Sequence, residues 1–139
     1  MSVRVIICER KTHWVVALRQ QLKTMSIRLY QTRSLQECWD DLSSYPTSLL
    51  VLELTIENKT DLINRLCCLS QEFPDARAVV VGERRLHNNE FLLREAGAIA
   101  VSFSPRHLGP VASLIGRYLE NHPAETELEQ ILERYSLDH

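Results

Sequence analysis

The strongest constraint on the fold is a near-continuous apolar run, Ser48-Leu49-Leu50-Val51-Leu52-Glu53-Leu54. The run has neither the 3.6-residue period of an amphipathic helix nor the alternation of a half-exposed strand. A short run of this kind predicts a strand that is buried on both faces, as the strands of parallel sheets are. Glu53 follows at its carboxyl end, and open α/β folds place their ligands and chemistry at that edge of the sheet.

Strand-like and helix-like segments alternate five times along the chain. The predicted strands span residues 3–8, 27–31, 48–54, 78–82 and 99–103. The segments between and after them carry apolar residues at helical spacing: Val15, Leu18 and Leu22; Leu35, Cys38, Trp39 and Leu42; Leu62, Leu66 and Leu69; Leu108, Val111, Ile115 and Tyr118. Ser34 and Glu37 have the spacing of a capping box. Asn88 or Asn89 is expected to cap the fourth helix, and Gly97 to end it.

This alternation predicts the topology. Strands joined by single helices form right-handed crossovers, which give a parallel sheet with helices on both faces. Five such units predict an α/β, flavodoxin-like, doubly wound five-stranded parallel sheet in the order 2-1-3-4-5. We divide the chain into a domain of residues 1–121 and a C-terminal helical extension, residues 122–139.

Composition narrows the classes of partner. The 16 Lys and Arg residues nearly balance the 18 Asp and Glu residues, for a net charge of −2, so no nucleic-acid partner is predicted. No apolar run approaches the roughly 20 residues that cross a membrane, and the first strand begins too early to leave room for a signal peptide. We therefore expect a cytoplasmic protein that binds neither nucleic acid nor membrane.

The cysteines and histidines show no ligand pattern. Cys8, Cys38, Cys67 and Cys68 form no CxxC pair, which predicts reduced and mostly buried thiols. The adjacent pair Cys67-Cys68 lies within a helical pattern, so we expect it to pack in the core. The chain has only four glycines and no phosphate-binding loop motif, and we predict no metal and no other cofactor.

Four segments together resemble the receiver domains of bacterial two-component response regulators, which have the CheY-like form of this fold. They are residues 4–10, residues 48–54, Ala96-Gly97-Ala98 and Val101-Ser102-Phe103-Ser104-Pro105, and the match covers residues 3 to about 120. The resemblance implies a role for each rim position. Glu53 would occupy the place of the phosphorylated aspartate. Glu9 and Arg10 would occupy those of the two acids that hold Mg²⁺.

The same resemblance places Gly82 at the switch hydroxyl, Val101 at the switch aromatic and Ser104 at the lysine, and it implies a cis peptide bond before Pro105. Each of these residues departs from the family pattern. A guanidinium at Arg10 repels a metal ion, and Glu53 is one methylene longer than aspartate. We therefore interpret the chain as a degenerate receiver, a pseudo-receiver.

Two of these positions leave alternatives open. Glu53 either mimics the phosphorylated aspartate permanently or is an acid tolerated at a solvated rim. Arg10 either pairs with Glu53 or Glu9, in place of the metal ion, or is exposed on its loop.

Residues beyond the fifth helix predict a sixth. Pro123, Glu125 and Glu127 suit a helix start. An apolar stripe follows at helical spacing: Leu128, Ile131, Leu132 and Tyr135. This stripe is expected to pack on its own domain or on a second subunit. Arg84 and Arg85 lie on a face that receivers use for partners, although such charges are usually just solvated.

The functional prediction is a non-catalytic signalling module, not an enzyme. It would bind a protein of a two-component or phosphorelay pathway independently of aspartate phosphorylation. The expected surface comprises the fourth helix, the fifth strand and the fifth helix, and the same surface or the C-terminal helix could form a homodimer. The alternative is a small flavodoxin-like ligand-binding protein or enzyme that uses the same sheet rim.

Overall fold

The structure is a computed structural model that describes residues 3–121. Its strands are β1 (Val5–Cys8), β2 (Leu29–Thr32), β3 (Leu49–Leu54), β4 (Arg77–Gly82) and β5 (Ala100–Ser102). Its helices are α1 (His13–Leu22), α2 (Leu35–Ser44), α3 (Lys59–Glu72), α4 (Glu90–Ala96) and α5 (Gly109–Asn121). Two 3₁₀ turns, η1 (Arg84–Asn89) and η2 (Pro105–His107), precede α4 and α5. The predicted C-terminal helix and its apolar stripe lie outside the described residues.

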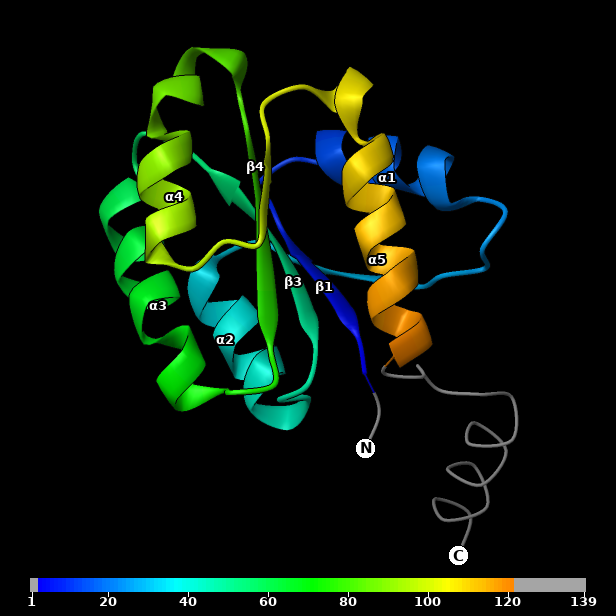
Figure 1. Ribbon diagram of the computed structural model, residues 1–139, viewed down its shortest axis with the longest axis horizontal. Helices are drawn as coiled ribbons and strands as arrows, with labels where there is room; N and C mark the ends of the chain where they lie inside the picture. The colour runs from blue at the N-terminus through cyan, green and yellow to red at the C-terminus, as the bar shows by residue number, and fades with distance from the viewer. Residues whose placement is uncertain (1–2, 122–139) are drawn as a thin grey trace, which may run out of the picture.

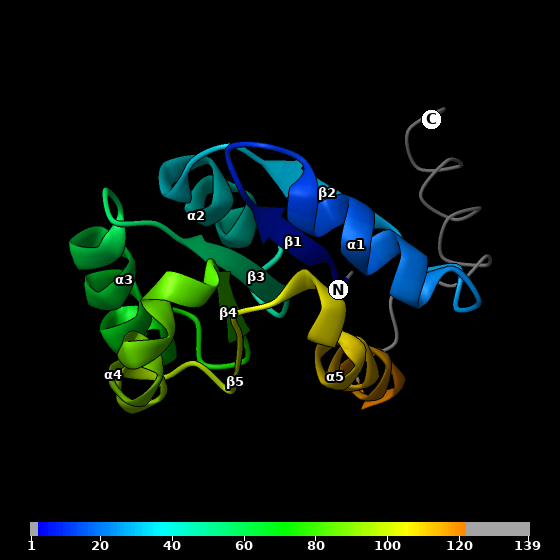
Figure 2. The ribbon, with the colours of Figure 1, turned by 90° about the horizontal axis from the view of Figure 1, so that it is seen from above.

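The five strands form one parallel sheet in the order β2-β1-β3-β4-β5, which confirms the predicted topology. Helices α1 and α5 cover one face, and α2, α3 and α4 cover the other (Figures 1 and 2). Strand order reverses between β1 and β3, so the loops that leave these two strands diverge to opposite faces. The carboxyl ends of β1 and β3 therefore flank the switch point. None of the described helices is long and apolar enough to cross a membrane.

Helix ends follow local sequence, with one exception. The Ser34 hydroxyl accepts a hydrogen bond from the Glu37 N–H at 3.1 Å, which confirms the cap of α2. Gly97 ends α4 with φ of 128°, a backbone conformation that side chains disfavour. Asn89 occupies the N-cap position of α4, as predicted, but its side chain makes no capping hydrogen bond. Asn89 instead donates to the Leu86 carbonyl at 3.0 Å, because residues 84–89 already form the 3₁₀ turn that runs into α4.

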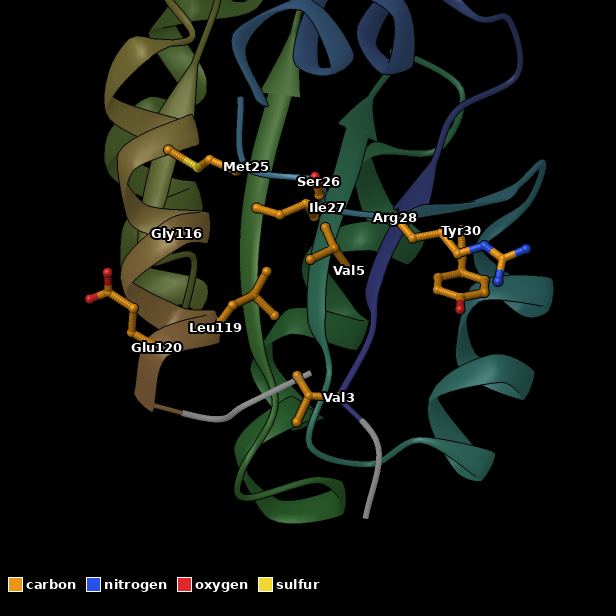
Figure 3. A pocket seen from close by; sticks show the side chains of 10 residues that line it. All are labelled: Val3, Val5, Met25, Ser26, Ile27, Arg28, Tyr30, Gly116, Leu119 and Glu120. Atoms are coloured by element: carbon orange, nitrogen blue, oxygen red, sulfur yellow. The ribbon is translucent and has the colours of Figure 1, made fainter. Parts of the chain in front are cut away.

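A groove opens at the amino-terminal edge of the sheet, between α5 and the segment that joins α1 to β2 (Figure 3). We call it the α5 groove. Its volume is about 460 Å³, and its apolar lining comprises Val3, Val5, Met25, Ile27, Gly116 and Leu119. Ser26, in the same turn, has a positive φ of 51° that places Met25 beside α5.

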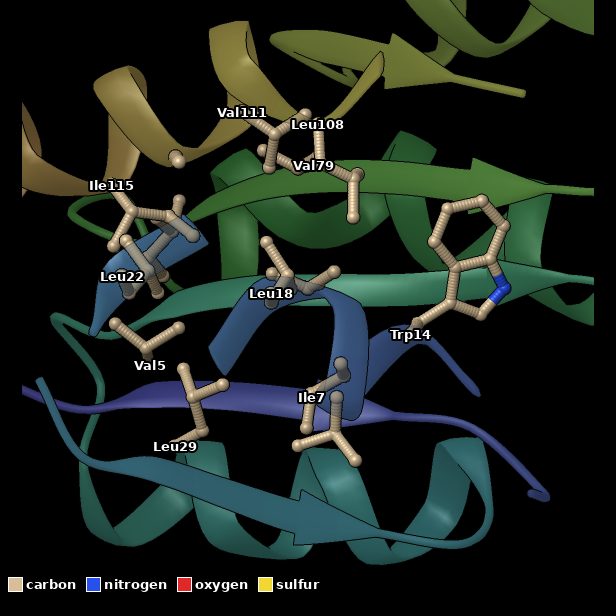
Figure 4. Close-up of a cluster of buried hydrophobic side chains, with 14 of the residues drawn as sticks. Val5, Ile7, Trp14, Leu18, Leu22, Leu29, Val79, Leu108, Val111 and Ile115 are labelled. Carbon is tan, nitrogen blue, oxygen red and sulfur yellow. The ribbon is translucent and has the colours of Figure 1, made fainter. Parts of the chain in front are cut away.

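Two apolar clusters lie on the two faces of the sheet. One packs α1 and α5 against the sheet through residues such as Trp14, Leu18 and Ile115 (Figure 4). The other packs α2, α3 and α4 through Leu42 and Leu62, among others. The predicted central strand contributes to both clusters, since Leu49, Leu50, Val51 and Leu52 are all fully buried. Burying one large apolar side chain contributes about 1.5–3 kcal/mol, so these clusters hold the helices on the sheet.

The prediction for the cysteines is half wrong. Cys8 and Cys38 are buried, but Cys67 and Cys68 are exposed. The buried stripe of α3 is Leu62, Leu66 and Leu69. At about 100° per residue, the two positions that follow Leu66 point away from that stripe and toward solvent.

Candidate functional site

The candidate site is a cavity of about 660 Å³ at the carboxyl edge of the sheet, which we call the rim cavity. Its lining includes Arg10, Trp14, Glu53, Gly82, Phe103 and Ser104. Apart from Trp14 of α1, these residues lie at or just after the ends of β1, β3, β4 and β5, whose parallel course brings their carboxyl ends to one edge. Pro105 also lines the cavity, whereas Val101 lies in β5 and lines a neighbouring hollow with Arg84 and Arg85.

Glu9 caps α1. Its side chain leaves the end of β1, and the residue is only 2% exposed. One carboxylate oxygen accepts a hydrogen bond from the Trp14 N–H at 2.9 Å, and the other accepts from the Val15 N–H at 2.8 Å. Both N–H groups belong to the first turn of α1, where a helix has no backbone acceptor of its own and attracts negative charge. The carboxylate is therefore committed to the helix.

Arg10 does not form the predicted charge pair. Its backbone N–H lies 3.5 Å from a Glu53 carboxylate oxygen, a long contact. The ion pairs within residues 3–121 join Asp61 to Arg65, Glu83 to Arg85 and Glu90 to Arg94, and none joins Arg10 to an acid. The Arg10 carbonyl accepts from the Arg33 side chain at 2.8 Å, which fixes the β1–α1 loop and leaves the guanidinium exposed at the cavity.

Glu53 is a half-buried acid whose charge is disfavoured. Burial raises its pKa above the usual value, and the negative charges of Glu9 and Glu83 raise it further. The backbone of Arg10 and the side chain of Trp14 lower it in part through hydrogen bonding. An acid paired with a cation shows the opposite direction. The exposed-Arg10 alternative is therefore the one that the geometry supports.

The loop after β3 is held by a closed set of hydrogen bonds. The Asn58 side chain accepts from the Thr55 N–H at 2.8 Å and donates to the Glu53 carbonyl at 2.8 Å. The Thr55 hydroxyl accepts from the Asn58 N–H at 3.0 Å. These bonds fix the backbone on which Glu53 is presented, so the acid sits on a rigid support.

The donor set does not fit the Mg²⁺ ion that the receiver resemblance implies. Mg²⁺ takes oxygen ligands in octahedral geometry. Both Glu9 oxygens already accept N–H groups, and Arg10 contributes a positive charge where the second acid is expected. Within residues 3–121, no group of three or more His, Cys, Asp or Glu side chains is placed to hold a metal ion.

Gly82 and Phe103 meet across the cavity, which sequence reasoning missed. A Cβ on Gly82 would lie 3.4 Å from Leu54 and 3.7 Å from the Phe103 ring. The space that a switch hydroxyl would need is thus bordered by an aromatic ring. Phe103 stands two positions after Val101, and both are partly buried against the cluster under α4. The aromatic residue is present at the rim, but at a different position from the one the family pattern assigns.

The predicted cis bond before Pro105 is wrong, since residues 3–121 contain no cis peptide bond. Ser104 instead caps η2, with its hydroxyl accepting from the Arg106 N–H at 3.3 Å. Its carbonyl accepts from the His107 N–H at 3.1 Å and from the Ser102 hydroxyl at 3.2 Å. Pro105 occupies the first position of the turn, where its missing N–H has no partner to lose.

Further cations line the rim cavity beside Arg10. They are Lys11, Arg84 and Arg106, and the same lining includes His13 and His107 and the acids Glu53 and Glu83. Three of these basic residues could have been found from the sequence. Lys11 directly follows Arg10 at the end of β1, and Arg106 and His107 directly follow the Ser104-Pro105 turn. Arg85, by contrast, forms an exposed pair with Glu83.

The strand order, the two helical layers and the rim at the carboxyl ends of β1 and β3 define a CheY-like receiver fold. No protein-family model matches the chain, and no curated protein sequence is significantly similar to it. Solved structures do match. A response regulator from Thermotoga maritima is 15% identical over 86% of this chain and 99% of that one, with a TM-score of 0.70.

Two further structures give the same fold. The beryllofluoride-activated NtrC4 receiver domain dimer is 16% identical over 85% of this chain and 97% of that one, with a TM-score of 0.66. The CheY-like protein TadZ from Pseudomonas aeruginosa is 16% identical over 84% of this chain and 94% of that one, with a TM-score of 0.64. The likeness spans nearly all of each structure and establishes the receiver fold for this chain.

Proposed function

We propose that this protein is a non-catalytic, receiver-like signalling module that acts by binding a protein, independently of phosphorylation at Glu53. The observation that carries the proposal is the double hydrogen bond from the first turn of α1 to the Glu9 carboxylate. Phosphoryl transfer to a carboxylate needs a metal ion and cations that stabilise the moving group. Here the remaining acid of the metal position serves the helix instead.

Three other residues support the same conclusion. Arg10 presents a positive charge at the metal position, and Ser104 is a turn cap where receivers carry a lysine. Burial raises the pKa of Glu53, so its charged form is disfavoured at the rim. These features support a rim at which phosphorylation of Glu53 is not the signal.

The test is chemical. The purified protein is incubated with acetyl phosphate and Mg²⁺, and separately with beryllofluoride and Mg²⁺. Intact mass should show no phosphoryl adduct, and amide NMR spectra should show no shifts at the rim. A phosphorylatable receiver in the same reaction controls for the reagent. A stoichiometric adduct that disappears in Glu53→Gln would overturn the proposal.

For the protein partner, the structure offers an apolar face on α4. Phe91 is 76% exposed and Leu92 is 45% exposed, whereas Leu93 in the same helix is fully buried. Ile99, which is 39% exposed, lies just before β5, the edge strand of the sheet. Exposed aromatic side chains are common anchors of protein interfaces. We propose this α4 face as the docking surface.

Partner binding is tested by affinity capture with matched variants. Phe91→Asp should abolish capture of the partner, while Val16→Asp should not. Val16 is 51% exposed but lies on α1, across the sheet from α4. The NtrC4 receiver of similar fold is a dimer when activated, so solution mass is measured in parallel. A dimer that Phe91→Asp dissociates would identify a second copy as the partner. Capture that is unchanged by Phe91→Asp would exclude the α4 face.

A small-ligand role at the same rim is the second candidate. The rim cavity of about 660 Å³, with Arg10, Lys11, Arg84 and Arg106 in its wall, is the observation that favours it. An absorbance spectrum of the purified protein, followed by native mass spectrometry, tests this candidate. A stoichiometric bound small molecule would favour it over the protein-binding module.

A further inference from the structure

The α5 groove is an apolar hollow that lies away from both the rim and the α4 face. Val3 and Val5 form its floor, and Ile27 and Leu119 face each other across it (Figure 3). Met25, which is 46% exposed, closes its upper end. Its sulfur would lie 3.4 Å from a Cβ on Gly116, so the absence of a side chain at Gly116 lets Met25 rest on α5.

The chain itself supplies an occupant. The last described turn of α5 contains Leu119 and Glu120, both of which line the groove, and α5 ends at Asn121. The next 18 residues, 122–139, therefore start at the wall of the groove. Pro123 cannot continue α5 without losing a hydrogen bond and clashing with the preceding turn, so a change of direction is expected there.

The length of this segment suits the groove. Asn121 and His122 would join the end of α5 to a helix that begins at Pro123, and a loop of about two to five residues is enough to connect two antiparallel helices. A helix from Pro123 to Tyr135 would be about 20 Å long, enough to run alongside α5 from its end toward Met25. Because the segment is tethered, its effective concentration at the groove is of millimolar order, which favours its own domain over a second molecule.

Charge is complementary as well. Residues 122–139 contain five acids (Glu125, Glu127, Glu129, Glu133 and Asp138) against one arginine. Residues 1–121 contain the other 13 acids and 15 of the 16 Lys and Arg residues. Arg28 lines the α5 groove, and Arg19 and Lys23 line the adjoining hollow that shares its Ser26–Arg28 wall. Glu120 is the one acid in the lining of these two hollows.

We propose that residues 123–135 fold back as an amphipathic helix into the α5 groove of their own chain. Leu128, Ile131, Leu132 and Tyr135 would cover Val3, Ile27 and Leu119, and the acidic face would lie beside Arg28 and Lys23. This inference goes beyond the proposed function and does not depend on it. It makes the C-terminal segment an intramolecular ligand of the α1/α5 face, on the opposite side of the sheet from the α4 docking face.

The direct test is methyl NMR on the full chain. Nuclear Overhauser contacts are expected between the Leu132 methyls and those of Met25 or Ile27. In a mixture of labelled and unlabelled protein, isotope-filtered spectra should show no such contacts, because the docking is within one chain. Contacts that appear only in the mixed sample would overturn docking in cis and assign the groove to a second copy. Absence of contacts in both samples would overturn the proposal altogether.

Matched variants test the apolar and the charged contributions separately. Leu132→Asp should lower the melting temperature by about 5–10 °C without changing the mass in solution. Gln130→Asp adds the same charge on the opposite side of the predicted helix and should have no such effect. Arg28→Glu should shift the methyl signals of Met25, while Arg117→Glu, an exposed reversal outside the groove lining, should not. Equal effects of Leu132→Asp and Gln130→Asp would refute the assigned stripe.

Discussion

Replacing Glu9 by alanine should destabilise the domain far more than replacing any other rim acid. The carboxylate is buried and accepts two hydrogen bonds, from Trp14 at 2.9 Å and Val15 at 2.8 Å. A hydrogen bond to a charged group contributes about 1.5–3 kcal/mol, and a buried N–H left without an acceptor costs about 1–3 kcal/mol. Glu9→Ala should therefore lower the free energy of unfolding by about 3–5 kcal/mol, a large share of the 5–15 kcal/mol typical of a domain.

The amide variant separates the charge from the acceptor. Glu9→Gln keeps one oxygen that accepts from the α1 backbone but turns the other acceptor into a donor that faces an N–H. It should cost about 1–2 kcal/mol, less than Glu9→Ala. Glu57→Ala is the matched control, because Glu57 is an exposed acid at the same edge of the sheet and accepts no hydrogen bond from residues 3–121. It should change stability by less than about 0.5 kcal/mol.

The assay is urea unfolding followed by circular dichroism, with each variant measured with and without Mg²⁺. Because Glu9 is committed to α1, Mg²⁺ should stabilise neither the parent protein nor the variants. A loss below about 1 kcal/mol in Glu9→Ala would refute the cap. Stabilisation by Mg²⁺ in the parent protein that is lost in Glu9→Ala would refute the wider argument, since Glu9 would then be a metal ligand.

Two further predictions follow from pKa directions. Because the Glu53 pKa is raised in the fold, ionisation of Glu53 opposes folding, and stability is lost as pH rises through that pKa. Glu53→Gln should therefore raise the free energy of unfolding at pH 7 by less than about 1 kcal/mol, and this gain should disappear below about pH 4. A lower free energy of unfolding for the variant at pH 7 would contradict this. If the charge mimics a phosphoryl group, the same variant should also weaken partner capture. Burial raises the pKa of the Cys8 thiol to about 11 and that of Cys38 further, so at pH 8 a thiol reagent should modify two thiols, Cys67 and Cys68, in the native protein and four in urea. Modification of all four at equal rates without urea would show that the core opens.

Local sequence determined the sheet, its order and the buried face of each long helix. Runs such as Leu49–Leu54 and stripes such as Leu62, Leu66 and Leu69 have lengths and periods that only one kind of element can bury. The cap of α2 could also be predicted from the sequence, because Ser34 and Glu37 lie within one turn of each other. In the cap and in each helical stripe the residues are close in sequence, so spacing alone fixes their contact. The strand order follows instead from the alternation of strands and helices, because their crossovers are right-handed.

Tertiary structure decided what the rim residues do. Trp14 and Val15 are only five and six residues from Glu9, but their N–H groups reach its carboxylate because α1 packs on the sheet with its first turn beside the end of β1. The exposure of Cys67 and Cys68, by contrast, could have been predicted locally, because both follow Leu66 off the buried stripe of α3. Phe103 reached Gly82 only because β4 and β5 lie side by side. Contacts between residues far apart in sequence depend on the packing of whole elements, and no local spacing encodes that packing.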